Sequence, residues 1–270
     1  MTDLSKLLNI ANEAVDIGRQ AAVTQELGTL TPKGDRDMAS EVDFAVEEAV
    51  RSFLAEATPT IEFLGEEEGR SGDDSGDLLW VLDPIDGTAN FVHGIPLVAI
   101  SLGLVAEESS LAGVIDMPFL SRRYSGSLGS GSYCNGQRIH GSKCDRLDDA
   151  IVAIGDYAVG VGARERNLPR LALTSLLAEK VQRVRMLGTA ATDLAWVADG
   201  SLDASIMFNN KPWDTSAGVL IAREAGVKVL DLDGMHHTFH SAGTIAVTTE
   251  LASDLMELVA DAQKSSTLAP

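Results

Sequence analysis

The apolar residues near the start of the chain recur every three or four positions, which is the spacing of one face of an α-helix. They predict an amphipathic helix over residues 4–15 and a second one over residues 42–53. Ser40 is expected to cap the second helix, because its hydroxyl can accept a hydrogen bond from the first turn. Glu47 and Glu48 lie outside the apolar face of that helix and are expected to point to solvent.

Short apolar runs separated by turn residues dominate the rest of the first half and predict strands. The segment 31–40 contains the breakers Pro32 and Gly34 and is predicted as a loop or hairpin, whereas the polar stretch 69–77 is predicted as a solvated loop. The expected strands cover residues 61–64, 78–82, 98–105, 111–116, 123–127 and 137–140.

The pattern changes near Cys144, where strands begin to alternate with helical segments. Such alternation is typical of a layered α/β unit. The expected strands are 151–154, 185–187, 204–208, 228–232 and 244–248, and the expected helices are 169–181, 190–198, 215–225 and 251–263. We therefore predict an α/β protein with an α+β first half, residues 1–145, and an α/β second half, residues 146–270, packed as one body.

Composition narrows the classes of function. The chain has 270 residues, 45% of them apolar, which is enough for a sizeable core and excludes general disorder. Its 40 acidic and 21 basic residues give a net charge of −19. This balance argues against binding to nucleic acid, which needs clustered basic residues, and against an anionic membrane surface.

The chain also lacks the sequence features of a membrane or secreted protein. No apolar run reaches the length of a membrane span, and the first twenty residues lack the basic start and apolar stretch of a signal peptide. Cys134 and Cys144 are therefore expected to be free thiols in a reducing cytoplasm.

Acidic residues gather at the ends of two predicted strands. The motif GEEEG, residues 65–69, follows one strand, and DPIDGT, residues 83–88, follows another. If Glu66, Asp83 and Asp86 converge, their charges repel one another and a bound cation makes the cluster favourable. Oxygen ligands of this kind suit the hard ions Mg²⁺ and Mn²⁺.

The backbone around DPIDGT adds further candidate ligands. A turn at Pro84-Ile85 would free the Ile85 carbonyl as a neutral metal ligand. The N–H groups of Gly87 and Thr88, at the start of a short helix, would hold an anion beside the metals. Each motif also has an ordinary interpretation, with GEEEG as a solvated loop and the two aspartates as turn residues.

Three separated motifs resemble the signatures of the inositol monophosphatase family, a group of Mg²⁺-dependent, Li⁺-sensitive phosphatases. They are GEEEG, WVLDPIDGTANFVHG and KPWDTSAGVLIAREAG, and the resemblance extends from about Lys33 to the last helix through KGDRDMASEVD, YCNGQRI and LGTAATDLAWVADGSLDA. The resemblance implies a layered α-β-α-β-α sandwich and a homodimer. It also implies hydrolysis of small phosphomonoesters, inositol 1-phosphate among them, by a metal-activated water.

The resemblance assigns metal ligands by position. Glu66, Asp83 and the Ile85 carbonyl match the ligands of a first ion. Asp83, Asp86 and Asp214 match those of a second ion, and Glu66 with waters would hold a weaker third. The expected cofactor is therefore two to three Mg²⁺ ions, with Mn²⁺ as the alternative.

The resemblance also assigns catalytic and phosphate-binding residues. Asp43 and Thr88 match the pair that activates the attacking water, with Glu66 beside them, and a Thr hydroxyl can relay a proton between a carboxylate and that water. Gly87 and Thr88 match the phosphate site. Considered alone, Asp43 has a simpler interpretation as an exposed residue of an amphipathic helix.

The substrate-contacting positions depart from the family pattern. The substrate-facing turn matches Gly188, Thr189 and Ala190. At the position where inositol-specific members have a Glu that contacts ring hydroxyls, this chain has Met207, whose thioether accepts hydrogen bonds only weakly. Asn209 or Asn210 remain as substitutes, and Met207 itself is either an apolar wall of the site or a core residue.

Two alternatives to an inositol 1-phosphatase stay open. One is the same chemistry on histidinol phosphate, fructose 1,6-bisphosphate or a 3′-phosphonucleotide. The other is a partner-binding protein without activity, against which the intact set of acidic residues argues. A panel of phosphate esters assayed with Mg²⁺ separates these alternatives.

Overall fold

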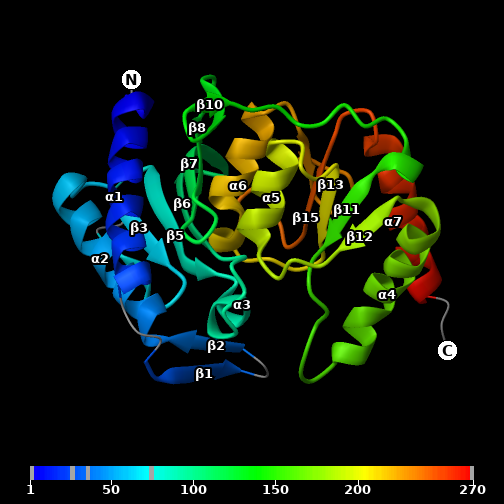
Figure 1. The fold of residues 1–270 in the computed structure, drawn as a ribbon, viewed down its shortest axis with the longest axis horizontal. Coiled ribbons are helices and arrows are strands. Elements are labelled where there is room, and N and C mark those ends of the chain that lie inside the picture. The colour runs from blue at the N-terminus through cyan, green and yellow to red at the C-terminus, as the bar shows by residue number, and fades with distance from the viewer. Residues whose placement is uncertain (1–2, 25–27, 35–36, 73–75, 268–270) are drawn as a thin grey trace.

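The computed structural model describes residues 3–24, 28–34, 37–72 and 76–267, and Figure 1 shows them as five stacked layers. Helices α1 (Leu4–Thr24) and α2 (Glu41–Ala57) form the first layer. An eight-stranded sheet follows, then helices α5 (Ala190–Ala198) and α6 (Pro212–Glu224), then a five-stranded sheet. Helices α4 (Ala163–Lys180) and α7 (Ala252–Thr267) form the last layer. The predicted α-β-α-β-α sandwich is confirmed.

The two helices of the first layer were predicted, but both extend beyond the predicted ranges. Their apolar faces pack on the larger sheet, with Val15 and Val46 among the fully buried residues. The side chain of Ser40 caps α2, as expected. The prediction for Glu47 was wrong, because its side chain is completely buried, whereas Glu48 is exposed.

The larger sheet has the order β10-β9-β8-β7-β6-β5-β3-β4 and is antiparallel except where β3 pairs with β5. Its strands are β3 (Glu62–Gly65), β4 (Gly69–Ser71), β5 (Leu78–Asp86), β6 (Ala99–Ala106), β7 (Ser109–Met117), β8 (Arg122–Ser127), β9 (Gly131–Cys134) and β10 (Gln137–Arg138). The short β4 forms a hairpin with β3, so the stretch predicted as a solvated loop begins as an edge strand.

The end of β5 departs from the expected turn. The strand continues through Asp83 and Pro84 to Asp86, and its register with β6 shifts between Asp83 and Asp86. An irregularity of this kind redirects side chains at a sheet edge without ending the strand. The two aspartates are therefore displayed by a distorted strand end and not by a turn that follows the strand.

The smaller sheet has the order β12-β11-β13-β15-β14. Strand β11 pairs in parallel with both of its neighbours, and β15 is antiparallel to both of its own. Its strands are β11 (Ile151–Ile154), β12 (Arg183–Arg185), β13 (Ala204–Met207), β14 (Lys228–Leu230) and β15 (Thr244–Val247). Helix α4 begins at Ala163, well before the predicted start at Pro169, and β12 ends where its strand was expected to begin.

The proposed boundary near residue 145 lies in the connection between β10 and β11, which contains the short 3-10 helix η1 (Leu147–Asp149). This boundary stays a prediction. Cys134 and Cys144 are free thiols. None of the helices in the described ranges is long and apolar enough to cross a membrane.

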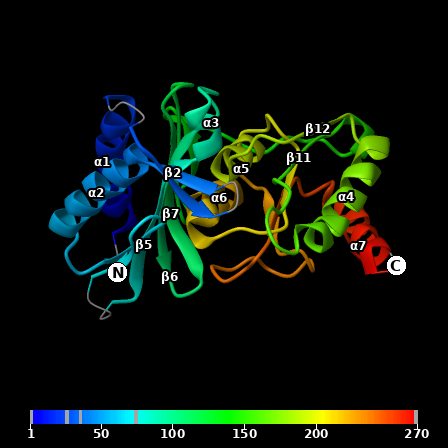
Figure 2. The same ribbon diagram turned by 90° about the horizontal axis from the view of Figure 1, so that it is seen from below.

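A small hairpin lies on one side of the molecule. Strands β1 (Leu30–Gly34) and β2 (Asp37–Ser40) pair antiparallel, in agreement with the predicted loop or hairpin. Figure 1 shows this hairpin on the same lower side as α3 (Thr88–Val92) and the connection from β11 to α4. Figure 2, seen from that side, shows the hairpin in front of the larger sheet.

Candidate active site

Asp86 links the larger sheet to the central helices. Its Oδ2 accepts hydrogen bonds from Thr189 Oγ1 at 2.5 Å and from the Ala191 N–H at 2.6 Å, and its Oδ1 accepts one from the Ala190 N–H at 3.3 Å. The first N–H groups of α5 have no partner within the helix, and the Asp86 carboxylate satisfies them. Burial raises the pKa of Asp86 to about 6, although these hydrogen bonds oppose the rise.

Asp83 is the most deeply buried carboxyl of the β5 strand end. Its side chain is 3% exposed, and its Oδ1 accepts a hydrogen bond from the Ile85 N–H at 3.1 Å. Burial raises the pKa of Asp83 well above its ordinary value, and the charges of Glu66, Asp86 and Asp214 raise it further. Carboxylates from the β3–β4 turn, from β5 and from α6 therefore raise the pKa of the same buried side chain.

Asp214 approaches the same place from α6. The helix starts at Pro212, three residues before the expected start at residue 215, so Asp214 is its third residue. Its Oδ2 accepts a hydrogen bond from the Lys211 N–H at 2.6 Å. Burial raises the pKa of Asp214 to about 7, with Asp86 and Glu66 adding to the effect.

These carboxyls fit a hard divalent cation by their chemistry. All donors are oxygens, and the raised pKa values mean that the ionised carboxylates are unfavourable when they are buried together, so a cation bound between them would lower this cost. As the side chains stand, no three or more His, Cys, Asp or Glu residues in the described part of the chain form a group that could hold a metal ion. The electrostatic convergence of these carboxyls is therefore the observation that supports a metal site.

Asp43 and Thr88, the pair that the family resemblance assigned to water activation, lie together. Thr88 Oγ1 is 3.3 Å from Asp43 Oδ1 and 3.0 Å from the Ile85 carbonyl oxygen. The other oxygen of Asp43 accepts hydrogen bonds from the N–H and the hydroxyl of Ser40, at 2.9 and 2.5 Å. Asp43 is buried, which overturns its simpler interpretation as an exposed helix residue, and burial raises its pKa.

Lys33 connects the hairpin to the GEEEG turn. Its Nζ donates to Glu66 Oε1 at 2.8 Å and to Glu67 Oε1 at 2.5 Å. Burial acts to lower the pKa of Lys33, but the two carboxylates raise it above its ordinary value. Burial raises the pKa of Glu67 to about 7 against the opposing effect of Lys33. The ammonium group thus supplies a positive charge at Glu66, a predicted metal ligand.

Glu47 holds the GEEEG turn from beneath, a role that the sequence analysis missed. Its carboxylate accepts the backbone N–H groups of Glu67 and Glu68 at 2.8 and 2.9 Å and pairs with Arg51. A Cβ atom at Gly65 would overlap this carboxylate, so the first glycine of the motif is needed for the close approach. The turn is therefore a fixed support for Glu66 and not a solvated loop.

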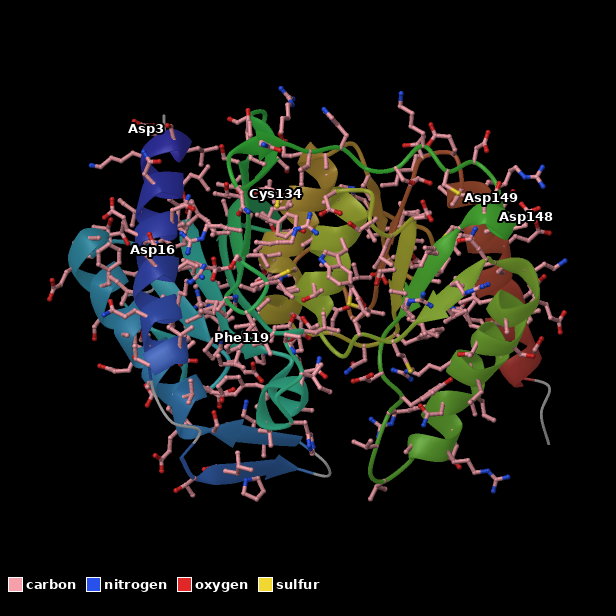
Figure 3. The ribbon with its side chains drawn as sticks, in the orientation of Figure 1. Asp3, Asp16, Phe119, Cys134, Asp148 and Asp149 are labelled. Atoms are coloured by element: carbon pink, nitrogen blue, oxygen red, sulfur yellow. The ribbon has the colours of Figure 1, made fainter. Side chains whose placement is uncertain are left out.

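Gly87 and α3 complete the edge of the site. Gly87 has φ +90°, a left-handed conformation that favours glycine, and a Cβ there would lie 2.9 Å from the Leu97 carbonyl oxygen. Asn90 Nδ2 fixes α3 by donating to the Leu97 and Leu187 carbonyls at 2.9 and 2.8 Å. Phe119, labelled in Figure 3, stacks against the Phe91 ring of α3 at 6.1 Å between centroids.

An open pocket of about 200 Å³ lies beside these residues. Asp86, Asp193 and Asp214 supply acidic groups to its wall. The predicted substrate-contacting residues Gly188, Thr189, Ala190 and Met207 all line it. Met207 is 3% exposed and also packs in the apolar core. It is therefore both a wall residue of the pocket and a core residue, the two interpretations that the sequence left open.

The structure separates the two candidate asparagines. Asn209 lines the pocket. The side chain of Asn210 is instead buried, donating to the Ser241 carbonyl at 3.1 Å and accepting from Thr244 Oγ1 at 2.9 Å. Asn209 is therefore the one available to a substrate hydroxyl.

Solved structures with the same architecture superpose on nearly the whole of this chain. The extragenic suppressor protein suhB from Bartonella henselae superposes with a TM-score of 0.87 and 32% identity over 94% of this chain and 98% of that one. An IMPase/NADP phosphatase complexed with Mg²⁺ and phosphate superposes with a TM-score of 0.79 and 25% identity over 94% of both chains.

Sequence comparison then gives the family. The profile of the inositol monophosphatase family matches residues 3–268, and the chain belongs to this family. It is 36% identical over 261 residues to the inositol-1-monophosphatase ImpA of Mycolicibacterium smegmatis, covering 95% of this chain and 94% of that protein. It is 34% identical to a fructose-1,6-bisphosphatase/inositol-1-monophosphatase of Aquifex aeolicus, covering 84% and 86%. The chain is a phosphatase that hydrolyses phosphomonoesters.

Proposed function

We propose that this protein is a Mg²⁺-dependent phosphatase that accepts several small phosphomonoesters, inositol 1-phosphate among them. The observation that carries the metal requirement is the convergence of Asp83, Asp86 and Asp214, whose pKa values are all raised by burial and by the charge of Glu66. Divalent cations would offset this repulsion. The solved relative that is complexed with Mg²⁺ and phosphate supports the same choice of ion.

The ligands follow the family pattern. Glu66, Asp83 and the Ile85 carbonyl would hold one ion, and Asp83, Asp86 and Asp214 a second, with a weaker third at Glu66. When bound, Mg²⁺ would neutralise phosphoryl charge and lower the pKa of a water. Mn²⁺ would substitute, and Li⁺ would inhibit at the Asp83–Asp86–Asp214 site.

Asp43 and Thr88 are proposed to handle the proton of the attacking water. The Thr88 hydroxyl directs its hydrogen toward Asp43 and the Ile85 carbonyl, which leaves a lone pair to accept a hydrogen bond from a water. Asp43 has a raised pKa, so it is a suitable acceptor for the proton that Thr88 relays. The N–H groups of Gly87 and Thr88 would bind the phosphoryl oxygens.

The breadth of the substrate range rests on Met207. A polar pocket built to bind hydroxyls discriminates strongly, whereas an apolar wall discriminates by about tenfold to a hundredfold. Asn209 is the amide that remains for a hydroxyl group. A homodimer in the cytoplasm, as the family resemblance and the thiols suggested, belongs to the same proposal.

A panel of phosphate esters tests the proposal. Phosphate release from inositol 1-phosphate, fructose 1,6-bisphosphate, histidinol phosphate and a 3′-phosphonucleotide is measured with Mg²⁺ and with EDTA. We expect release from several esters with Mg²⁺ only, and the same pattern for Glu48→Gln, a control on the exposed side of α2. Preference for one ester by more than about a thousandfold would refute the broad range.

A further inference from the structure

A second hollow, with a volume of about 520 Å³, lies next to the active-site pocket. Asp156 and Asn209 line both hollows, so the two are neighbours. The rest of the lining of the second hollow comes from the connection from β11 to α4 and the first turns of α4, together with Phe208. Its wall includes two arginines, Arg166 and Arg170, and these carry the inference.

Arg170 is a buried cation without a carboxylate. It is 7% exposed, and its guanidinium lies 5.2 Å from the centroid of the Phe208 ring. Nη1 donates to the Arg166 carbonyl at 2.6 Å, and Nε–H is buried without an acceptor. Buried arginines are almost always paired, and a buried donor without a partner calls for an explanation.

Arg166 adds a second positive charge that is also not neutralised. Its Nη2 donates to the Val159 and Val161 carbonyls at 2.7 and 3.0 Å, which are neutral acceptors. Arg166 acts with burial to lower the pKa of Arg170, so the two charges repel each other. Within the residues that the structure describes, neither arginine forms an ion pair with a carboxylate.

The chain is strongly acidic, with 40 acidic and 21 basic residues, and several of its cations, such as Arg146, are paired with neighbouring aspartates. Asp156 is the carboxylate in the lining of the second hollow, and in the described ranges it forms no ion pair with Arg166 or Arg170. Its charge acts on Asp193, on the active-site side. Two adjacent cations without acidic partners therefore face a hollow beside an anion-processing site, where an anion would offset their repulsion.

The residues between the two hollows suit a polyol. The Asp156 carboxylate accepts hydrogen bonds from hydroxyl groups, and the Asn209 amide both accepts and donates them. A sugar whose first phosphate lies at the acidic cluster would pass these two side chains before it reached the arginines. Guanidinium groups bind phosphate through several parallel hydrogen bonds, which makes arginine the preferred residue for this task.

We propose that Arg166 and Arg170 form a subsite for a second phosphate, and that the favoured substrates are polyol or sugar bisphosphates. This inference rests on the proposed function, because the subsite matters only if the neighbouring pocket hydrolyses a phosphate ester. It specifies the substrate class for a chain whose Met207 has replaced the usual hydroxyl-binding Glu. The phosphate at the arginines is kept. At the acidic cluster, the oxygen of water bonds to phosphorus, the bond from phosphorus to the sugar oxygen breaks, and that oxygen takes up a proton, so the products are inorganic phosphate and a sugar monophosphate with a free hydroxyl.

A ratio of specificities tests the subsite. The kcat/KM for fructose 1,6-bisphosphate is divided by that for fructose 1-phosphate, which lacks the second phosphate, in the wild type, Arg166→Gln and Arg170→Gln. Charge-assisted hydrogen bonds predict a wild-type ratio of about tenfold to a hundredfold and a fall toward one in both variants. Arg164→Gln, which removes an exposed arginine of the same helix outside the hollow, is the matched control and keeps the ratio.

A binding measurement separates failure of the subsite from failure of the proposed function. Binding of fructose 6-phosphate, the product that keeps the second phosphate, is measured by calorimetry in EDTA. Binding that weakens at least tenfold in Arg166→Gln supports the subsite even if no ester is hydrolysed. A wild-type ratio near one, or equal binding by wild type, Arg166→Gln and Arg164→Gln, overturns it. Arg166 is exposed, so its variant is expected to fold even if Arg170→Gln does not.

Discussion

At Asp214, burial and neighbouring carboxylates raise the pKa to about 7, far above the ordinary value near 4. An acid whose pKa is raised by folding favours the folded state below pH 4, and that contribution is lost as the pH rises through 7. In EDTA, Asp214→Asn should therefore melt a few degrees above the wild type at pH 8, and the difference should shrink toward pH 5. The amide oxygen can still accept the Lys211 N–H.

The control for this experiment is Asp254→Asn, an exposed acidic residue in the first turn of α7. It should show no gain that grows with pH. A gain for Asp214→Asn that is the same at pH 5 and pH 8 would mean that ionisation of Asp214 is not the cause.

Asp83 gives the second prediction at the scale of single residues. Asp83→Asn should be folded and nearly inactive, because Asp83 is proposed to contact two ions at once. Phosphate release and thermal melting are measured together. A variant that kept more than a tenth of the wild-type rate, equivalent to about 1.4 kcal/mol, would refute the bridging role. Metal-free Asp83→Asn should melt above the wild type, since burial disfavours the ionised carboxyl.

The elements show where local patterns are sufficient and where they are not. Helical spacing predicted α2, and the capping role of Ser40 was correct, because both depend on neighbours in sequence. The same spacing placed Glu47 in solvent, since the N–H groups that it binds belong to a turn some twenty residues away. The register shift at the end of β5 was also missed, because it depends on pairing with β6.

Glu47→Ala tests the support that α2 gives to the GEEEG turn. The change removes the acceptor of two backbone N–H groups and the buried carboxylate that pairs with Arg51, and removal of one partner of a buried ion pair costs about 3–5 kcal/mol. Chemical denaturation should show this loss, and the Mg²⁺ concentration for half-maximal activity should rise. Glu48→Ala, one residue along on the exposed side, should stay within about 0.5 kcal/mol of the wild type. Equal effects of the two variants would contradict the account.

Over the whole molecule, the active site joins parts that are distant in sequence. Asp86 belongs to the larger sheet, and its hydrogen-bond donors belong to the start of α5, about one hundred residues later. The sequence could predict these residues as a set because the motifs resemble those of one family. It could not predict the hydrogen bonds between Asp86 and the start of α5, because no motif marks them. For the same reason it could not predict the hollow that is lined by Arg166 and Arg170.

Met207→Glu tests how substrate choice depends on this wall of the pocket. A Glu would accept hydrogen bonds from ring hydroxyls, so the efficiency for inositol 1-phosphate should rise relative to the other esters while the Mg²⁺ requirement stays the same. Circular dichroism checks that the variant folds, because Met207 also packs in the core. If all esters change by the same factor, Met207 does not determine specificity.

The central claim is that the buried carboxylates form a divalent metal site on which phosphate-ester hydrolysis depends. The most direct measurement is the rate of phosphate release from inositol 1-phosphate and fructose 1,6-bisphosphate as Mg²⁺ is added back to EDTA-treated protein. We predict no release at zero Mg²⁺ and a saturable recovery of activity toward both esters as Mg²⁺ rises. Undiminished release after exhaustive removal of divalent ions would contradict the account.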